Sequence, residues 1–199
     1  MPLSSPPPRE PIHTRQIECR GFRRQDGLWD IEGHITDTKS YGFGNRERGR
    51  VEAGMPIHDM WMRVTIDDGL TIHAIEAVTD SSPYRICPEV TPRFQRLVGL
   101  RIGPGFQRAV RERLGGTEGC THLVELLVPL GTTAFQTVFP IVDREQFTRS
   151  QEGTGTAAKP RQRPPLLDSC YAFSAEREVV RSHWPDFFRP PGGGTPPRG

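Results

Sequence analysis

The residues best suited to chemistry lie in the segment GCTHLVE, which places Cys120 and His122 two positions apart beside a glycine. An apolar run follows, so we expect both residues in the first turn of a helix. The unpaired N–H groups and the dipole at a helix start acidify a thiol. Cys87 precedes a second expected helix. Because thiolate and imidazole bind zinc, and thiolates hold iron–sulfur clusters, the sequence predicts a zinc or iron–sulfur site at these three residues.

Further ligands are expected from His58 and Asp59, at the start of a predicted strand, and Cys170 is a third candidate. Each has a structural alternative. Free cysteine is among the most often buried residue types, and a polar pair at a strand end commonly faces solvent. Cys19 is in phase with apolar neighbours and is assigned to packing. The sequence leaves open whether Cys170 joins the site and whether any metal binds.

Two other functions compete with metal binding. The first is a thiol-dependent enzyme acting on small acyl or aromatic substrates, with Cys120 as nucleophile and His122 or His58 as base. Helix residues two positions apart do not face each other, which weakens His122 as that base. The second is a metal-free interaction domain that docks an unidentified protein partner through its arginine-rich helix and the closing WPDFF segment. The sequence does not decide whether the protein is an enzyme.

Two hairpins are expected to position these residues. The segment from His13 to Lys39 alternates apolar and polar residues around a turn at 25–27, and 57–79 does the same around Asp68-Gly69. Together they predict an antiparallel four-stranded sheet with one buried face. The charged, glycine-rich stretch between them, 42–54, is expected to be a mobile loop that is too polar to pack.

Helical spacing replaces strand alternation in the second half of the chain. A short helix is expected near 92–98, a second over 106–114 with a glycine cap, and a third over 120–139 with a kink at Pro129. The predicted fold class is α+β: an antiparallel sheet of two hairpins, followed by about three helices packed on one face.

Proline and glycine gather at the two ends, which indicates tails around a folded region. The predicted organisation is a disordered proline-rich tail at 1–11, an α+β domain at 12–141, a flexible linker at 142–165, a C-terminal segment packing on the domain at 166–188, and a disordered glycine- and proline-rich tail at 189–199.

Composition limits the partners and the compartment. The 26 lysines and arginines nearly balance 24 acidic residues, giving a net charge of +2, which argues against a nucleic-acid partner. No stretch approaches the roughly 18 to 20 apolar residues of a membrane span, and the start lacks a signal-peptide core. We therefore expect a cytoplasmic protein without a membrane partner. The four widely spaced cysteines then favour free thiols or metal ligands over disulfides.

Several segments together resemble a widespread bacterial family known only as a domain of unknown function: IHTRQIECRGF, HDMWMRVTID, ICPEV, LVGLRIGPGF, GCTHLVELL and LLDSCYAF. The resemblance covers roughly residues 10–188. It implies a shared fold and location, and no catalytic residue. Members often carry Cys-His in the closing segment, where this chain has Cys170-Tyr171.

The order of elements is also similar, more distantly, to the scaffold proteins of iron–sulfur cluster assembly, in which an Asp, three Cys and a His surround the cluster. That resemblance would match Cys87 to the central-loop cysteine, and Cys120 with His122 to the closing pair in changed order and spacing. The first scaffold cysteine has no counterpart, because His58-Asp59 stands in its place. A mononuclear zinc or iron site, or a scaffold-like fold without metal, is an equal expectation.

Overall fold

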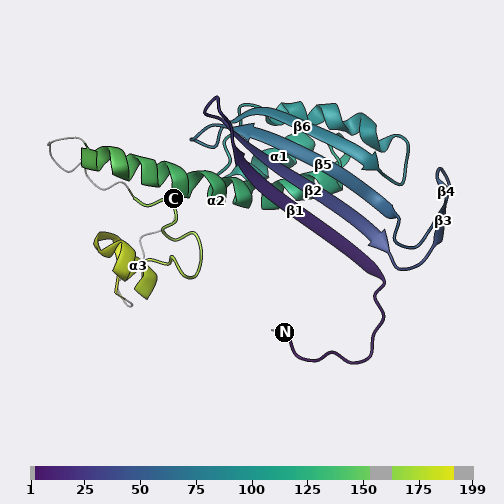
Figure 1. The fold of residues 1–199 in the computed structure, drawn as a ribbon, viewed down its shortest axis with the longest axis horizontal. Helices are drawn as coiled ribbons and strands as arrows, with labels where there is room; N and C mark the ends of the chain where they lie inside the picture. Colours follow the sequence, from purple (N-terminus) through teal and green to yellow (C-terminus); the bar gives the residue numbers. More distant parts are fainter. Residues whose placement is uncertain (1–2, 153–162, 191–199) are drawn as a thin grey trace. The chain divides into compact units, whose positions relative to one another are not determined.

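The computed structural model describes residues 3–152 and 163–190 (Figure 1). It confirms the α+β class. Residues 3–152 contain an antiparallel sheet in the order β1-β2-β5-β6, with helices on one face. Its strands are β1 (His13–Arg23), β2 (Trp29–Lys39), β5 (Pro56–Ile66) and β6 (Ile72–Ser81).

Burial alternates strictly along β2, as the sequence pattern predicts. Every second residue from Trp29 to Asp37 is buried, and the residues between them are half-buried. Since neighbouring side chains on a strand point to opposite faces, one face of the sheet is in the core and the other is open. Strand β5 continues the buried face with Met60, Met62 and Val64.

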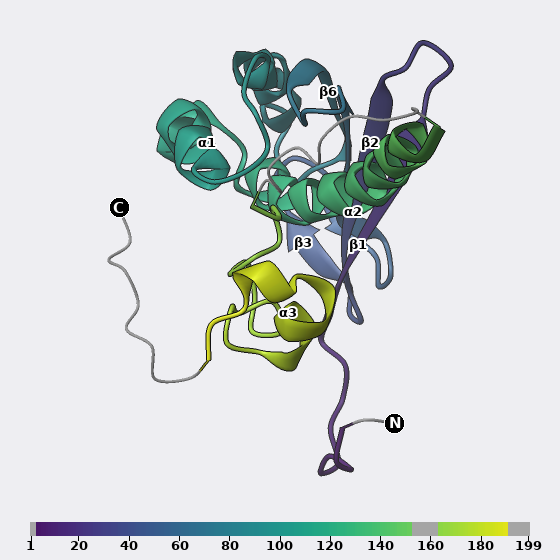
Figure 2. The same cartoon turned by 90° about the vertical axis from the view of Figure 1, so that its left-hand side faces the viewer.

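The helices pack on the buried face. Helix η1 (Cys87–Leu97) lies against β6, followed by α1 (Phe106–Leu114) and η2 (Gly116–Glu118). Helix α2 (Thr121–Glu152) lies along β1 and β2, as Figure 2 shows. Its sheet-facing stripe is fully buried: Leu123, Leu126, Leu127, Leu130, Ala134 and Val138.

Two glycines let α2 approach the sheet closely. A Cβ at Gly21 would collide with the Thr137 side chain, and one at Gly33 would lie 3.0 Å from Leu130. Two ion pairs also join β1 to α2, one from Arg15 to Glu125 and one from Arg23 to Glu145. Helix α2 is therefore held in a fixed position along β1.

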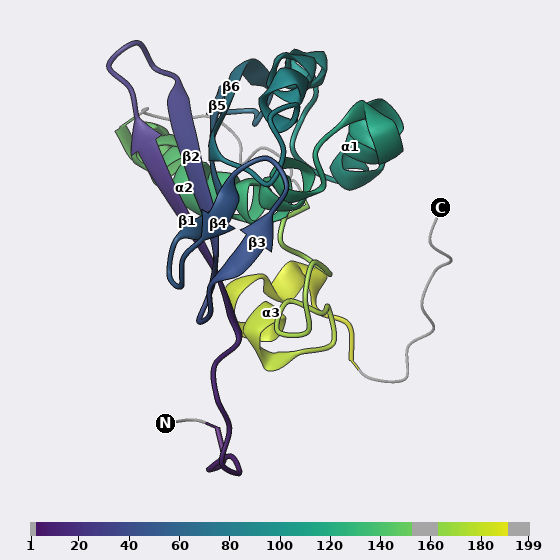
Figure 3. The ribbon, with the colours of Figure 1, turned by 90° about the vertical axis from the view of Figure 1, so that its right-hand side faces the viewer.

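Three local expectations need correction. The stretch 42–54 is not only a loop: it holds the hairpin of β3 (Phe43–Asn45) and β4 (Gly49–Val51), which lies beyond the sheet's end in Figure 1 and in front of the sheet in Figure 3, because Val51 is buried and anchors it. The first helix is a 3-10 helix over 87–97, with Pro92 inside it. Helix α2 runs on through 142–152, where a linker is expected, because Ile141 and Val142 still pack on the core.

One helix in the described part, over Thr121–Glu145, is long and apolar enough to cross a membrane by length and composition alone. From the sequence we expected no apolar stretch of this length, and that expectation missed this helix. A core helix passes the same test, and this one packs its leucine stripe on the sheet. Only 28% of its most apolar window is buried.

Residues 163–190 form a separate unit. It contains α3 (Glu178–His183) and η3 (Pro185–Phe187). Leu167, Ala175 and Val180 form its small core, flanked by Trp184. Most of the expected C-terminal tail at 189–199 and the middle of the expected linker lie outside the described residues, and the packing expected for 166–188 stays a prediction.

Candidate metal centre

Three strands bring a cation, a carboxylate and an imidazole into one row at the end of the sheet. Arg15 on β1 pairs in register with Asp37 on β2, and Asp37 pairs with His58 on β5. Directly paired residues of antiparallel strands point to the same face. Here that is the covered face, and the start of α2 adds His122 from above.

Asp37 is the centre of the cluster and is only 1% exposed. Its Oδ1 accepts hydrogen bonds of 2.9 Å from His13 Nε2 and Arg15 Nε. Its Oδ2 accepts one of 2.9 Å from Arg15 Nη2 and one of 3.0 Å from His58 Nδ1. Burial alone would raise the pKa of Asp37, but the bidentate Arg15 guanidinium outweighs it and lowers that pKa to about 2. The carboxylate is therefore charged at neutral pH.

The two imidazoles lie ring to ring beside this carboxylate. The His58 and His122 ring centroids are 3.7 Å apart at 32°, and His122 Nε2 lies 3.9 Å from Asp37 Oδ2. Burial lowers the pKa of both rings; the neighbouring His122 lowers that of His58 further, and Arg15 that of His122. Both rings are thus held in the neutral form, which is the form that binds metal ions.

One ligand atom from each of Asp37, His58 and His122 falls within 4.8 Å of the others. The surrounding charges favour a cation there. Arg15 also donates to Glu125 Oε2 at 2.6 Å, so two carboxylates face one guanidinium. With neutral imidazoles the group of Arg15, Asp37 and Glu125 carries a net charge of about −1.

Cys120 contacts this group from behind His122. Its Sγ lies 3.9 Å from His122 Nδ1, whereas the other ring nitrogen, Nε2, faces Asp37. The thiol and the carboxylate therefore lie on opposite edges of one ring. Cys120 is half-buried and is placed to fix the ring's orientation, as outer partners of metal-binding histidines do.

Asp59, Cys87 and Cys170 are not among the residues whose ligand atoms converge. Asp59 points to the open face, where its Oδ1 is 2.7 Å from His34 Nε2. Cys87 begins η1 and is not among the three residues whose ligand atoms converge. Cys170 is exposed in the separate C-terminal unit. Of the five predicted ligands, His58 and His122 share a site with Asp37.

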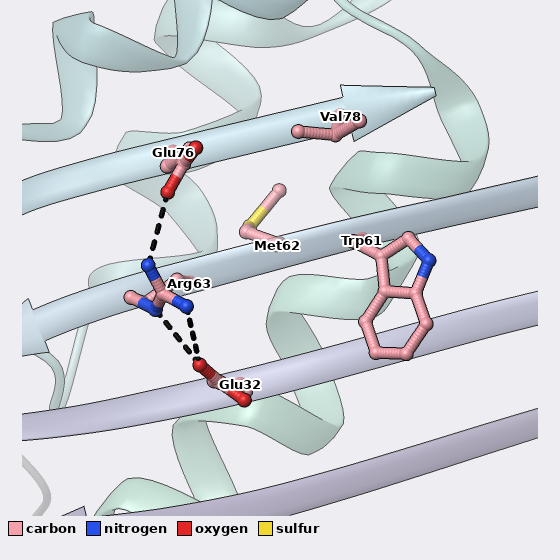
Figure 4. Close-up of a pocket in the computed structure, with 6 residues that line it drawn as sticks. All are labelled: Glu32, Trp61, Met62, Arg63, Glu76 and Val78. Carbon is pink, nitrogen blue, oxygen red and sulfur yellow. Dashed lines mark hydrogen bonds and ion pairs between the residues drawn. The ribbon is translucent and has the colours of Figure 1, made fainter. Parts of the chain in front are cut away.

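The open face carries the second Asp–His pair. The His34 ring stacks on Trp61 at 3.6 Å and 6°, and Trp61 is 42% exposed. Beside it Arg63 bridges Glu32 and Glu76 across three strands, and Trp61 and Val78 complete the wall of a shallow depression (Figure 4). This face consists of exposed ion pairs and one aromatic stack.

Sequence reasoning missed Asp37, Arg15 and His13. Asp37 could have been found from its position in the strand pattern. It continues the alternating series of Ile31, Gly33 and Ile35, so a carboxylate stands where an apolar residue is expected. A buried charge is costly unless it is paired, so an in-phase Asp itself indicates a partner on the same face. Arg15 and His13 share that phase across the first hairpin.

Residues 13–136, more than half of the chain, match the family described as "Protein of unknown function (DUF2889)". The chain belongs to this family. The match includes Asp37, His58 and His122, as well as His13 and Arg15. No curated protein and no solved structure matches the sequence. The DUF2889 description carries no activity, so any function rests on the site's own chemistry.

Proposed function

We propose that this DUF2889 protein binds a divalent transition metal ion, zinc or ferrous iron, through Asp37, His58 and His122. The observation that carries the proposal is the convergence of two neutral imidazoles and one buried carboxylate within 4.8 Å. Two histidines and a carboxylate form the donor set of catalytic zinc sites and of non-haem iron sites.

The spacing of the donor atoms supports an ion between them. Metal–ligand bonds of about 2.0–2.2 Å in a tetrahedral site place neighbouring donors about 3.3 Å apart. His58 Nδ1 and His122 Nε2 lie 3.0 and 3.9 Å from Asp37 Oδ2, on either side of that value. Binding an ion would turn the two adjacent rings towards it, and the Nδ1 proton of His58 would move to Nε2 of the same ring.

The outer contacts suit this arrangement. His13 and the Arg15 Nε group hold Asp37 Oδ1, whereas Oδ2 accepts from Arg15 Nη2 and His58 Nδ1 and is the oxygen that both imidazole nitrogens approach. Glu125 offsets the Arg15 charge that would otherwise repel the ion. Such partners orient ligands and commonly change metal affinity by about 10- to 100-fold.

The donor set favours a single ion over an iron–sulfur cluster. Clusters are held by several thiolates, whereas the converging atoms here are two nitrogens and one oxygen. Three protein ligands also leave a coordination position open for water or substrate, as catalytic zinc sites do. We infer a mononuclear site able to take an exogenous ligand, in a cytoplasmic protein.

The test is metal content and affinity of the full chain. Protein purified without added metal is analysed for zinc and iron by mass spectrometry, and the metal-free form is titrated with Zn²⁺ and Co²⁺. Wild type should bind about one ion per chain, and His58→Ala and His122→Ala should each weaken binding at least about 100-fold. The Co²⁺ absorption should report nitrogen and oxygen ligands.

His34→Ala is the matched control, because it removes a histidine hydrogen-bonded to an aspartate on the same two strands but on the open face. It should bind metal like wild type. Equal metal binding by wild type, His58→Ala and His122→Ala would refute the proposal.

A second function is favoured by one contact. Cys120 Sγ lies 3.9 Å from His122 Nδ1, although residues two apart on a helix do not normally face each other. That contact suits a thiol-dependent enzyme acting on small acyl or aromatic substrates, with His122 as base. Labelling with iodoacetamide at neutral pH separates the two: rapid labelling of Cys120, slowed by His122→Ala, supports the enzyme, and uniformly slow labelling of all cysteines contradicts it.

A further inference from the structure

The two edge strands of the sheet, β6 and β1, differ in whether other parts of the chain form hydrogen bonds with their outer sides. At β6 the outer edge is covered by the segment that follows: Gly99 N donates to Ile72 O, Ile72 N donates to Leu100 O, and the Gln95 side chain donates to Ile75 O. At β1, along 11 residues, the described part of the chain supplies no hydrogen bond to the outer side. A long uncovered edge strand is a template for pairing with another chain.

The outward-facing backbone groups of β1 can be assigned. Arg24 N donates to Leu28 O and Ser40 N to Ile12 O, which are bonds between residues one step beyond each end of the β1–β2 register. Hydrogen-bonded and non-hydrogen-bonded pairs alternate in an antiparallel ladder. The even-numbered residues of β1 therefore bond to β2. The odd-numbered residues, Arg15 to Arg23, present their N–H and C=O groups outward.

Helix α2 is incompletely covered by the described part of the chain. Residues 126–142 contain no charged residue, yet Val128 is 51% exposed and Thr132, Gln136 and Pro140 are also exposed. Thr137 meets β1 at Gly21, so the flank of α2 that carries Thr137 borders the open edge. Val128, nine residues away and therefore half a turn round the helix, faces away from β1. Surface helices of a monomer normally carry charge on their outer face. An uncharged flank of α2 and the free edge thus adjoin each other.

We propose that the partner covering this edge is a second copy of the chain, with the two β1 strands antiparallel and centred on Cys19. Outward-facing residues must pair with outward-facing residues, which permits a centre on a residue and excludes centres between residues. Glu18 and Cys19 lie at the middle of β1, so centring there pairs most of the strand. Centring on Glu18 sets two glutamates opposite each other. Centring on Cys19 sets Glu18 opposite Arg20 of the second copy, twice by symmetry, so the 2.6 Å Glu18–Arg20 ion pair of each chain meets that of the other with opposite charges facing.

The remaining contacts fit this register. Arg15 falls opposite Arg23 of the second copy, but each is already neutralised within its own chain, by Glu125 and Glu145 at 2.6 Å. With strands about 4.8 Å apart and each α2 beneath its own β1–β2 gap, the two α2 helices lie about 10 Å apart. That is the ordinary helix-packing distance, so the uncharged flanks of α2 that carry Thr137 face each other.

Charge reversal at the paired residues tests the proposal. Sedimentation equilibrium of the full chain should show a dimer for wild type. Glu18→Arg and Arg20→Glu should each raise the dimer dissociation constant by about tenfold or more, because each places like charges opposite each other twice. An equimolar mixture of the two variants should restore the dimer, since Glu18→Arg in one chain then faces Arg20→Glu in the other with opposite charges.

Glu76→Arg on β6 is the matched control, an exposed charge reversal on the same open face at the other edge. It should leave the dimer intact, and circular dichroism should show all variants folded. A monomeric wild type would overturn the proposal, as would a dimer unaffected by both reversals. Recovery of monomers on phospholipid vesicles would also overturn it by assigning the α2 surface to lipid. None of these outcomes depends on metal binding.

Discussion

Strands β2 and β5 carry an Asp–His pair on each face of the sheet, and the two pairs differ in their surroundings. On the covered face Asp37 bonds His58, and α2 adds His122. On the open face Asp59 bonds His34, whose other neighbour is the exposed Trp61 ring. The pairs have the same chemistry, the same strands and nearly the same hydrogen-bond length, so their environment alone distinguishes them.

The difference shows how burial turns a common pair into a candidate site. Asp37 is 1% exposed and needs a bidentate Arg15 and two imidazoles to remain charged. The Asp59 side chain is 26% exposed and water can satisfy its remaining oxygen. A buried carboxylate needs hydrogen-bond donors or cations around it, so additional donors lie close together at Asp37. A convergent set of metal ligands arises there and not at Asp59.

Removing each carboxylate should give the largest contrast between the faces. Asp37→Ala leaves Arg15 and two imidazoles around an empty position and should lower the free energy of unfolding by about 3 kcal/mol. Asp59→Ala removes one partly exposed pair and should cost less than about 1 kcal/mol. Urea unfolding of the metal-free proteins in EDTA measures both. Equal losses would show that the two faces do not differ as described.

Acid should test the charge of Asp37 on the covered face. The pKa of Asp37 is lowered from 3.8 to about 2 in the folded protein, since Arg15 outweighs the opposing effect of burial. A lowered folded pKa stabilises the fold above the unfolded value and loses that stabilisation as the pH falls towards 2. We expect metal-free wild type to lose about 2 kcal/mol between about pH 5 and pH 2 from this group.

The same series on Asp37→Asn isolates that contribution. The variant keeps the shape of the side chain without a titrating group, so its stability should fall less steeply over the same interval. Parallel curves for wild type and Asp37→Asn would contradict the assignment.

The sheet and its helices were predictable because their signals are local. Alternation from Trp29 to Ile35 indicates one buried face, and four-residue spacing of Phe106, Val110 and Leu114 indicates α1 at the bounds observed. The hairpin at 42–54 was not predictable from its polarity, because its anchor is the single buried Val51. One apolar residue in a charged stretch does not reveal the contact that buries it.

The site was only partly predictable, because it depends on strand register. His58 and His122 were expected from residue type, but the partner that joins them, Asp37, is 21 residues from His58 and is brought there by pairing across β2 and β5. The prediction of Cys87 assumed that two helix starts converge. In the structure Cys87 begins a 3-10 helix, and only Cys120 reaches a histidine of the group.

The smallest contrast concerns how tightly the covered face is packed. Gly21 points towards α2, and an added methyl group would collide with the Thr137 side chain, including its Cβ, so the helix or the strand must shift. Gly21→Ala should therefore lower the free energy of unfolding by about 1–2 kcal/mol. Gly44→Ala is the matched control in β3, where no atom lies within 4 Å of the added carbon. It should change stability by less than about 0.5 kcal/mol. Because α2 carries His122, Gly21→Ala should also weaken Zn²⁺ binding slightly, and a variant as stable and as tight-binding as wild type would show that α2 is free to move on the sheet.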